Sequence, residues 1–226
     1  MEQINFFPFT LSLKTATIST VIVFILGVFL AYVFTRRHFF GKSVLEAIIL
    51  LPLVLPPTVV GFGLLYLFGK NGIIGKMLIS LFDLQIVFTW YGALLASIVV
   101  SFPLMYQSAV AAFQQYDRNL EYVAYTLGKS RWTVFWTVSF PLAWPGILAG
   151  VVLAFARALG EFGATLMIAG YIPNVTDTIP LAIYFAVESG EMGVAKFWVT
   201  IIVVLGFIAI FWLNWWSARH MMKHRN

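Results

Sequence analysis

The chain has 226 residues, of which 61% are hydrophobic and only 10% are charged, with a mean hydropathy of +0.92. Soluble domains carry about a quarter charged residues, so this composition excludes an ordinary soluble domain and predicts a membrane protein. The absence of cysteine excludes disulfides and thiolate metal sites. The net charge of +5 calls for no nucleic-acid partner, because the basic residues gather beside apolar runs, as membrane topology requires.

Five apolar runs are long enough to cross a bilayer core of about 30 Å. The predicted spans are 11–34, 44–68, 87–113, 145–169 and 197–216. Residues 69–86 are too short to span and are expected to form an external loop with a surface helix. Segment 178–190 is apolar at its centre and could re-enter the membrane. No linker, low-complexity run or repeat divides the chain, so we expect one all-α, polytopic domain over 1–226.

Prolines interrupt the second and third spans. A helix broken at such a density survives in a membrane only where neighbours or a water-lined cavity satisfy the freed carbonyl groups. The alternative is a kinked structural helix that packs through its glycines, and for any single residue that alternative is favoured. For the stretch LPLVLPPTVVGFG as a whole, we favour the translocation pathway. The pathway candidates from these spans are Pro52, Pro56, Pro57 and Pro103.

The longest polar interruption, 117–145, separates two very apolar runs. Leu120, Val123, Ala124 and Leu127 share one face of a short amphipathic helix, with Glu121 off that face. Gly128 is expected to end this helix in a left-handed conformation. Ser130 is placed to cap a second helix, and Pro141 and Pro145 lead into the next span. The stretch predicts a helix, a glycine elbow and a second helix.

Span four carries an arginine and a glutamate near mid-membrane, where an ionised side chain costs at least ~2.5 kcal/mol. Arg157 and Glu161 are at i and i+4, on one helix face. One interpretation is mutual neutralisation that fixes this span against its neighbours. The other is that Arg157 faces the pathway and attracts an anion. The two interpretations are compatible and equally favoured.

The distribution of Lys and Arg predicts the topology. Nine of the fourteen fall in segments that we assign to the cytoplasm. By the positive-inside rule, the N-terminus lies outside and the C-terminus inside. The nine are Arg36, Arg37, Lys42, Arg118, Lys129, Arg131, Arg219, Lys223 and Arg225.

No catalytic constellation is present in the sequence. HExxH, GxSxG and the GxxxxGK[ST] phosphate loop are all absent. We therefore expect no catalytic residue, metal or cofactor in this chain, and no ATPase site of its own. An intramembrane enzyme would need ionisable residues that face each other from different spans, whereas Arg157 and Glu161 lie on one helix.

The elbow resembles the cytoplasmic signature loop of permease subunits of binding-protein-dependent ABC importers, in which E-A-A is followed by three residues, G, nine residues and I-x-L-P. Ala124, Gly128, Val138, Phe140 and Pro141 match its spacing, while Glu121 lies one residue early. A plain interfacial helix between two spans is the alternative. The resemblance implies a coupling loop over 117–141 that docks on an ATPase subunit. The residues to which it assigns coupling to the ATPase are Glu121, Ala124, Leu127, Gly128 and Pro141.

FARALGEFGAT in span four and LPLVLPPTVVGF in span two resemble the molybdate permeases among oxyanion importers, over nearly the whole chain. Sulfate permeases typically have a tyrosine and a serine where this chain has Phe162 and Ala164. The resemblance implies a type I, MetI-like fold in a bacterial or archaeal cell membrane. It also implies a second copy, two ATPase subunits holding ATP and Mg, and an extracytoplasmic molybdate-binding protein. Sulfate or tungstate permeases and an autonomous anion channel or carrier remain alternatives.

Overall fold

The computed structural model describes residues 5–223, and within that range the chain is helical with connecting loops. The side chains of Arg219 and Lys223, and all of Arg225, which were assigned to the cytoplasmic tail, lie outside the described part. Four helices are long and apolar enough to cross a membrane, and a bent helix pair raises the number to five. The predicted all-α, polytopic class is confirmed.

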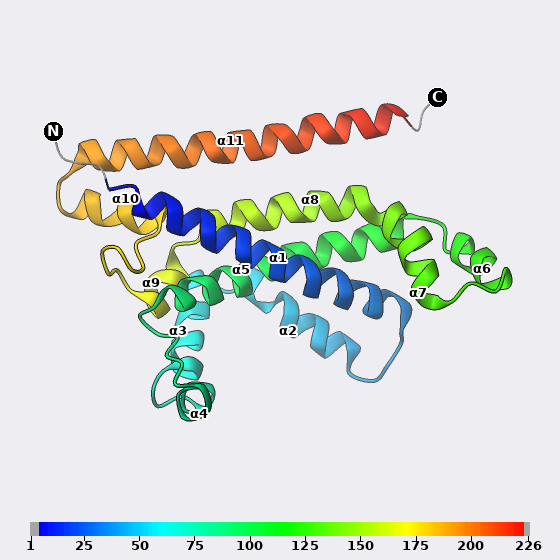
Figure 1. Ribbon diagram of the computed structural model, residues 1–226, viewed down its shortest axis with the longest axis horizontal. Helices are drawn as coiled ribbons and strands as arrows, with labels where there is room; N and C mark the ends of the chain where they lie inside the picture. Colours follow the sequence, from blue (N-terminus) through cyan, green and yellow to red (C-terminus); the bar gives the residue numbers. More distant parts are fainter. Residues whose placement is uncertain (1–4, 224–226) are drawn as a thin grey trace.

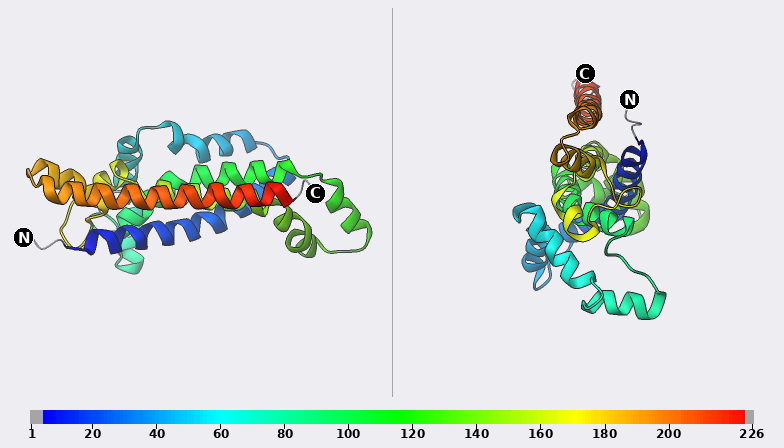
Figure 2. Two further views of the ribbon diagram at one scale, coloured as in Figure 1. Left: turned by 90° about the horizontal axis from the view of Figure 1, so that it is seen from above. Right: turned by 90° about the vertical axis from the view of Figure 1, so that its left-hand side faces the viewer.

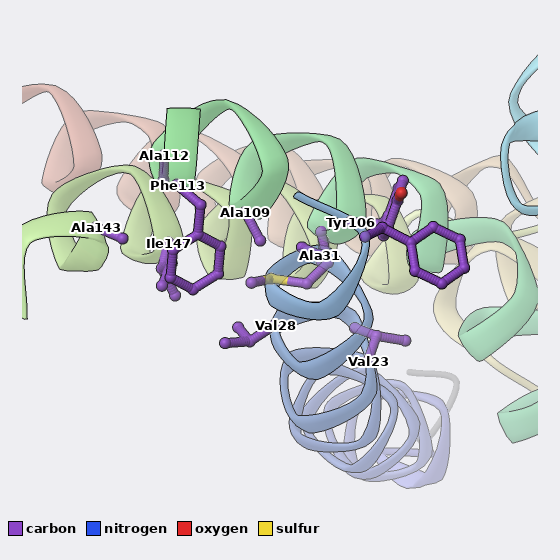
Figure 3. Close-up of a cluster of buried hydrophobic side chains, with 12 residues drawn as sticks. Val23, Val28, Ala31, Tyr106, Ala109, Ala112, Phe113, Ala143 and Ile147 are labelled. Carbon is purple, nitrogen blue, oxygen red and sulfur yellow. The ribbon is translucent and has the colours of Figure 1, made fainter. Parts of the chain in front are cut away.

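Three long helices form the centre of the molecule: α1 (Phe7–Arg36), α5 (Trp90–Gln115) and α8 (Phe140–Leu159). They pack side by side along the long axis (Figure 1). Their contact surfaces combine small and branched apolar side chains with aromatic ones, and Figure 3 shows Phe113 of α5 beside Ile147 of α8. Helices in lipid gain little from hydrophobic burial against each other, so small residues that allow close packing stabilise such a bundle.

The predicted span 44–68 is two helices rather than one kinked helix: α2 (Lys42–Val54) and α3 (Pro57–Phe68), bent by 118°. Leu55 and Pro56 each precede a proline and are extended, with ψ of 144° and 137°. A residue before proline is sterically disfavoured in the helical region, so two prolines in succession break the helix. Pro57 then occupies the first position of α3, where its missing N–H costs nothing.

The predicted span 145–169 also has different bounds. The helix begins at Arg131 and runs through α7 (Arg131–Val134), the π-helix η1 (Phe135–Ser139) and α8 without interruption. It ends at Leu159, and the separate helix α9 (Gly163–Ala169) follows. The wide turn of η1 lies directly before Pro141, which has no N–H to donate to the helix.

The remaining helices lie around this bundle. The loop helix α4 (Ile73–Phe82) and helices α2 and α3 lie on the side opposite α11 (Met192–Lys223), as Figure 1 and the right-hand view of Figure 2 show. The short helix α10 (Ile179–Glu188), from the segment for which re-entry into the membrane was left open, packs against the start of α11. Only 11% of the apolar window of α11 is buried within the chain, against 50% for α5. Lipid or another subunit must therefore cover α11.

Candidate functional site

The elbow projects from one end of the molecule, next to the end of α1 (Figure 1). It consists of α6 (Asn119–Thr126), a turn at Gly128, and the α7–η1 segment. Gly128 has φ +78°, and the side chain of Ser130 accepts a hydrogen bond from the Thr133 N–H at 3.2 Å. The predicted left-handed glycine and the predicted serine cap are therefore both confirmed.

The carboxylate of Glu121 anchors the elbow to the bundle. It forms an ion pair with Arg36 at the end of α1 and accepts hydrogen bonds from the hydroxyls of Tyr116, at the end of α5, and Ser139, in η1. The Ser139 bond measures 2.7 Å. Residues from four elements thus meet at one carboxylate, whose residue is only 3% exposed. A buried charge is tolerated where it is paired and hydrogen-bonded in this way.

The pKa of Glu121 reflects the same contacts. Burial alone raises the pKa of a carboxyl, but the hydrogen bonds from Arg36, Tyr116 and Ser139 outweigh it and leave the pKa below its ordinary value. Glu121 therefore stays ionised at neutral pH. The charge-assisted hydrogen bonds it accepts fix the position of α6 relative to α1 and α5.

The apolar face of α6 points away from the bundle. In an amphipathic helix that packs on its own chain, the apolar face points toward the bundle. Leu120, Val123 and Leu127 are 48%, 57% and 74% exposed, Ala124 is half-buried, and Glu121 is the buried side chain. The Glu121 carboxylate faces the bundle, so it is not part of the exposed surface of the elbow. Leu127, Gly128 and Pro141 are exposed, whereas Glu121 supports the surface from behind.

Arg36, Tyr116 and Ser139 are the functional residues that sequence analysis missed. Arg36 was interpreted only as a topology charge, and it lies 85 residues from Glu121. No local spacing links the two. The early position of the glutamate in the signature pattern was the single available signal, because a carboxylate off the apolar face of a helix must find its partner elsewhere.

The second candidate site lies where the broken helices meet. Arg157 pairs with Glu161 at 2.7 Å, and Glu161 also accepts a hydrogen bond from the Ala164 N–H at 2.7 Å, which satisfies a free donor at the start of α9. The side chain of Glu161 is 1% exposed and that of Arg157 is 30% exposed. Mutual neutralisation is therefore present in the structure, and the guanidinium is partly accessible as well.

The break between α2 and α3 lies beside the break between α8 and α9. A Cβ added at Gly163 would lie 3.0 Å from Pro57 Cβ, and one added at Gly61 would lie 2.7 Å from Ala164 Cα. Non-helical backbone at membrane depth is tolerated where protein or a water-filled cavity surrounds it. Membrane transporters use such discontinuous helices to form substrate pathways.

The proline candidates do not all lie together. Pro56 and Pro57 are exposed at the break and Pro52 is half-buried within α2, whereas Pro103 is buried inside α5. Pro103 thus belongs to the packed bundle and not to an open surface. Among the side chains that the structure describes, no group of three or more His, Cys, Asp or Glu could hold a metal ion.

Comparison with known proteins places this geometry in a family. Residues 23–222 match the model of the binding-protein-dependent transport system inner membrane component. A candidate molybdenum transport permease of Bacillus subtilis is 49% identical over 92% of each chain. The molybdenum transport system permease protein ModB of Escherichia coli K12 is 44% identical over 92% of this chain and 91% of its own. A sulfate transport permease candidate of Marchantia polymorpha is 35% identical over 95% of this chain and 74% of its own.

Two solved structures share the fold. A bacterial ABC transporter involved in alginate import has a TM-score of 0.76 at 16% identity, covering 97% of this chain and 80% of its own. The inward-facing MetNI methionine ABC transporter has a TM-score of 0.68 at 14% identity, covering 94% of each chain. At these identities the two structures show the fold and not the substrate.

Proposed function

The chain belongs to the family of binding-protein-dependent transport system inner membrane components, and on this premise we propose that it is the membrane-spanning permease of an ATP-driven molybdate importer. The choice of molybdate as the substrate rests on sequence identity. Molybdenum permeases are 43–49% identical to this chain along more than nine-tenths of its length, whereas the sulfate relative is 35% identical. The cargo is then a tetrahedral dianion.

The outer face of α6 supports coupling to a separate ATPase subunit. Its exposed leucines and valine form an apolar surface with no partner within residues 5–223, and such a surface fits a groove on another protein. ATP and Mg belong to that partner, because the sequence has no phosphate-binding loop. The permease itself is then a transport subunit and not an enzyme.

The anchor at Glu121 supplies the mechanical step. Closure of the ATPase subunits on ATP moves the elbow, and the ion pair with Arg36 transmits this movement to α1 and, through Tyr116, to α5. The bundle then favours its outward-open state, and hydrolysis returns it to the inward-open one. The ATPase acts through differential binding to these two states.

In a homodimer, the broken helices of the two copies would line a pathway between them. The exposed faces of α2 and α11 need cover, and a two-fold axis would place two copies of Arg157 around one passage. Glu161 balances each guanidinium, so the passage attracts the anion without holding it tightly. Tight selection then belongs to an extracytoplasmic binding protein. The N-terminus lies outside and the C-terminus inside the bacterial or archaeal cell membrane.

The test is ATP hydrolysis in proteoliposomes that contain this chain with its co-purifying ATPase and binding protein. Molybdate should stimulate hydrolysis more strongly than sulfate, with tungstate as the intermediate comparison. Stronger stimulation by sulfate than by molybdate would overturn the assignment of molybdate as the substrate. Anion flux by the chain alone, with no ATPase bound, would replace the importer with a channel or carrier.

A further inference from the structure

A groove runs between the exposed side of α1 and the elbow. Its volume is about 400 Å³, and apart from Arg131 its lining side chains are apolar or aromatic. Phe29 on α1 is 62% exposed and Trp132 on α7 is 71% exposed, so the groove is open to its surroundings. The principal lining residues are Phe24, Val28, Phe29, Trp132, Phe135 and Trp136.

A second, charged pocket of about 650 Å³ continues this groove. The two cavities share Tyr32, Val33 and Arg131 as lining residues, so one leads into the other. Four arginines line the pocket against a single carboxylate, that of Glu121. These arginines are Arg36, Arg37, Arg118 and Arg131.

The charges of this pocket are largely uncompensated. Glu121 pairs with Arg36, and even there the Arg36 Nε is buried without a hydrogen-bond partner. Within residues 5–223, no ion pair is formed by Arg37, Arg118 or Arg131. The pocket thus presents three unpaired guanidinium groups, and guanidinium matches the oxygens of a phosphate group in bidentate geometry.

We propose that this continuous cavity binds an anionic phospholipid, with an acyl chain in the groove and the phosphate group among the arginines. The pocket lies where α1 leaves the apolar run, at the end rich in Arg and Lys, and basic pockets between helices on the cytoplasmic side are suited to anionic head groups. A second copy of this chain complements the pocket poorly, because it carries a net charge of +5. The inference depends on the membrane placement of this end and not on the transported anion.

The bound lipid would join α1 to the elbow through the pocket that Glu121 also lines. Arg37 belongs to the connection after α1, Arg118 directly precedes α6, and Arg131 begins α7, so one phosphate would link three segments. Anionic lipid would then stiffen the elbow relative to the bundle. This adds a lipid requirement to a part of the molecule that contacts no transported anion.

The absence of cysteine allows a direct test with one introduced label. Phe29→Cys, labelled with a small fluorophore, places a reporter in the groove of the full chain in liposomes. Brominated phosphatidylglycerol should quench it several-fold more than brominated phosphatidylcholine at equal mole fraction. A control label at Val21→Cys, on the exposed side of α1 outside the groove, should be quenched equally by both.

Arginine variants assign the effect to the pocket. Arg131→Gln should reduce the preference for phosphatidylglycerol roughly fivefold, as expected for one basic side chain at an anionic head group. Arg131→Lys should retain most of the preference, which separates loss of charge from loss of folding. Lys76→Gln, which removes an exposed charge from α4, should change nothing. None of these readouts requires transport, so they stand apart from the molybdate test.

Three results would overturn the proposal. Equal quenching by both lipids at Phe29 would remove the anionic preference. Absence of quenching by either lipid would mean that protein, such as a second copy of the chain, covers the groove. Full displacement of phosphatidylglycerol by millimolar inorganic phosphate would mean that the arginines bind free phosphate and the groove plays no part.

Discussion

Replacing Glu121 with glutamine should separate the elbow from the bundle without changing the size of the side chain. The substitution removes the only carboxylate that faces Arg36 in the described part of the chain and leaves a guanidinium whose side chain is 12% exposed without its counter-charge. Removal of one partner from a buried ion pair typically costs about 3–5 kcal/mol. Glutamine can still accept from Tyr116 and Ser139, so we expect a loss near the lower value, about 3 kcal/mol.

A second ion pair in the chain provides the matched control. Glu46 pairs with Lys42 at 3.8 Å, with side chains 34% and 23% exposed. Because this pair is longer and partly exposed, and because glutamine can still accept the hydrogen bond from the Tyr106 hydroxyl at 3.2 Å, Glu46→Gln should cost less than about 1 kcal/mol. The two variants carry the same chemical change and differ in burial.

Thermal unfolding of the purified variants in detergent, followed by ATP-driven uptake in proteoliposomes, measures both effects. At about 2–4 °C per kcal/mol for a chain of this size, Glu121→Gln should lower the midpoint by roughly 6–12 °C and Glu46→Gln by a few degrees at most. Glu121→Gln should also reduce uptake per ATP hydrolysed. An equal lowering of the unfolding midpoint in the two variants, or normal coupled uptake by Glu121→Gln, would refute the proposal that Glu121 anchors the elbow.

The stability that Glu121 contributes should fall in acid. The folded pKa of Glu121 is below its ordinary value, so its contribution is complete at neutral pH and is lost as the pH falls through that lowered pKa, below the ordinary value of 4.5. The wild-type chain should therefore lose stability in this acid window. Glu121→Gln removes this titration and should show a smaller acid loss, and an unchanged acid profile would contradict the assignment.

Three further predictions concern other parts of the chain. Gly61→Ala should destabilise by about 1–3 kcal/mol in thermal unfolding, because its Cβ would lie 2.7 Å from Ala164 Cα, whereas Gly63→Ala, with no atom within 4 Å, should be tolerated; equal losses would refute this contact. Gly128→Val should cost about 1–2 kcal/mol at φ +78° and uncouple uptake from ATP hydrolysis, with Gly128→Asn as the tolerated control; normal coupling in the valine variant would exclude a role for this turn. Burial raises the pKa of Asp177, so its charge opposes folding at neutral pH and less so in acid; Asp177→Asn should raise the midpoint at pH 7, and a lower midpoint would show that the charge has a partner.

Sequence patterns predicted the elements with local causes. Gly128 and Ser130 define the elbow through their own backbone and side chains, and a span such as α5 follows from its length and hydropathy. Pro56 and Pro57 indicated an irregularity in the second span. The size of the bend depends on the packing of α3 against α9, which no local sequence pattern encodes. The sequence therefore predicted a single span with prolines inside it, where the structure has two helices.

The orientation of α6 could not be predicted for a related reason. Periodicity identifies which side chains share a face, but not whether that face packs on its own chain or on another protein. The deciding contact is the pairing of Glu121 with Arg36, across 85 residues of sequence. For Arg157 and Glu161 the i, i+4 spacing predicted the ion pair, but the expectation that both lie on one helix is wrong, because α8 ends at Leu159 and Glu161 lies in the break before α9.

One continuous helix connects the two candidate sites. From Arg131 to Leu159 it begins at the elbow, passes the Glu121 anchor at Ser139, and contains Arg157 in its last turn. At 1.5 Å per residue it is about 43 Å long, which matches the thickness of a bilayer with its head groups. Because this helix is continuous and packs along α5, we expect displacement at the elbow to reach the α8–α9 break. The Glu121 anchor and the α8–α9 break thus lie toward opposite ends of one helix. Loss of the anchor should reduce coupling to ATP hydrolysis more than it alters the path of the anion.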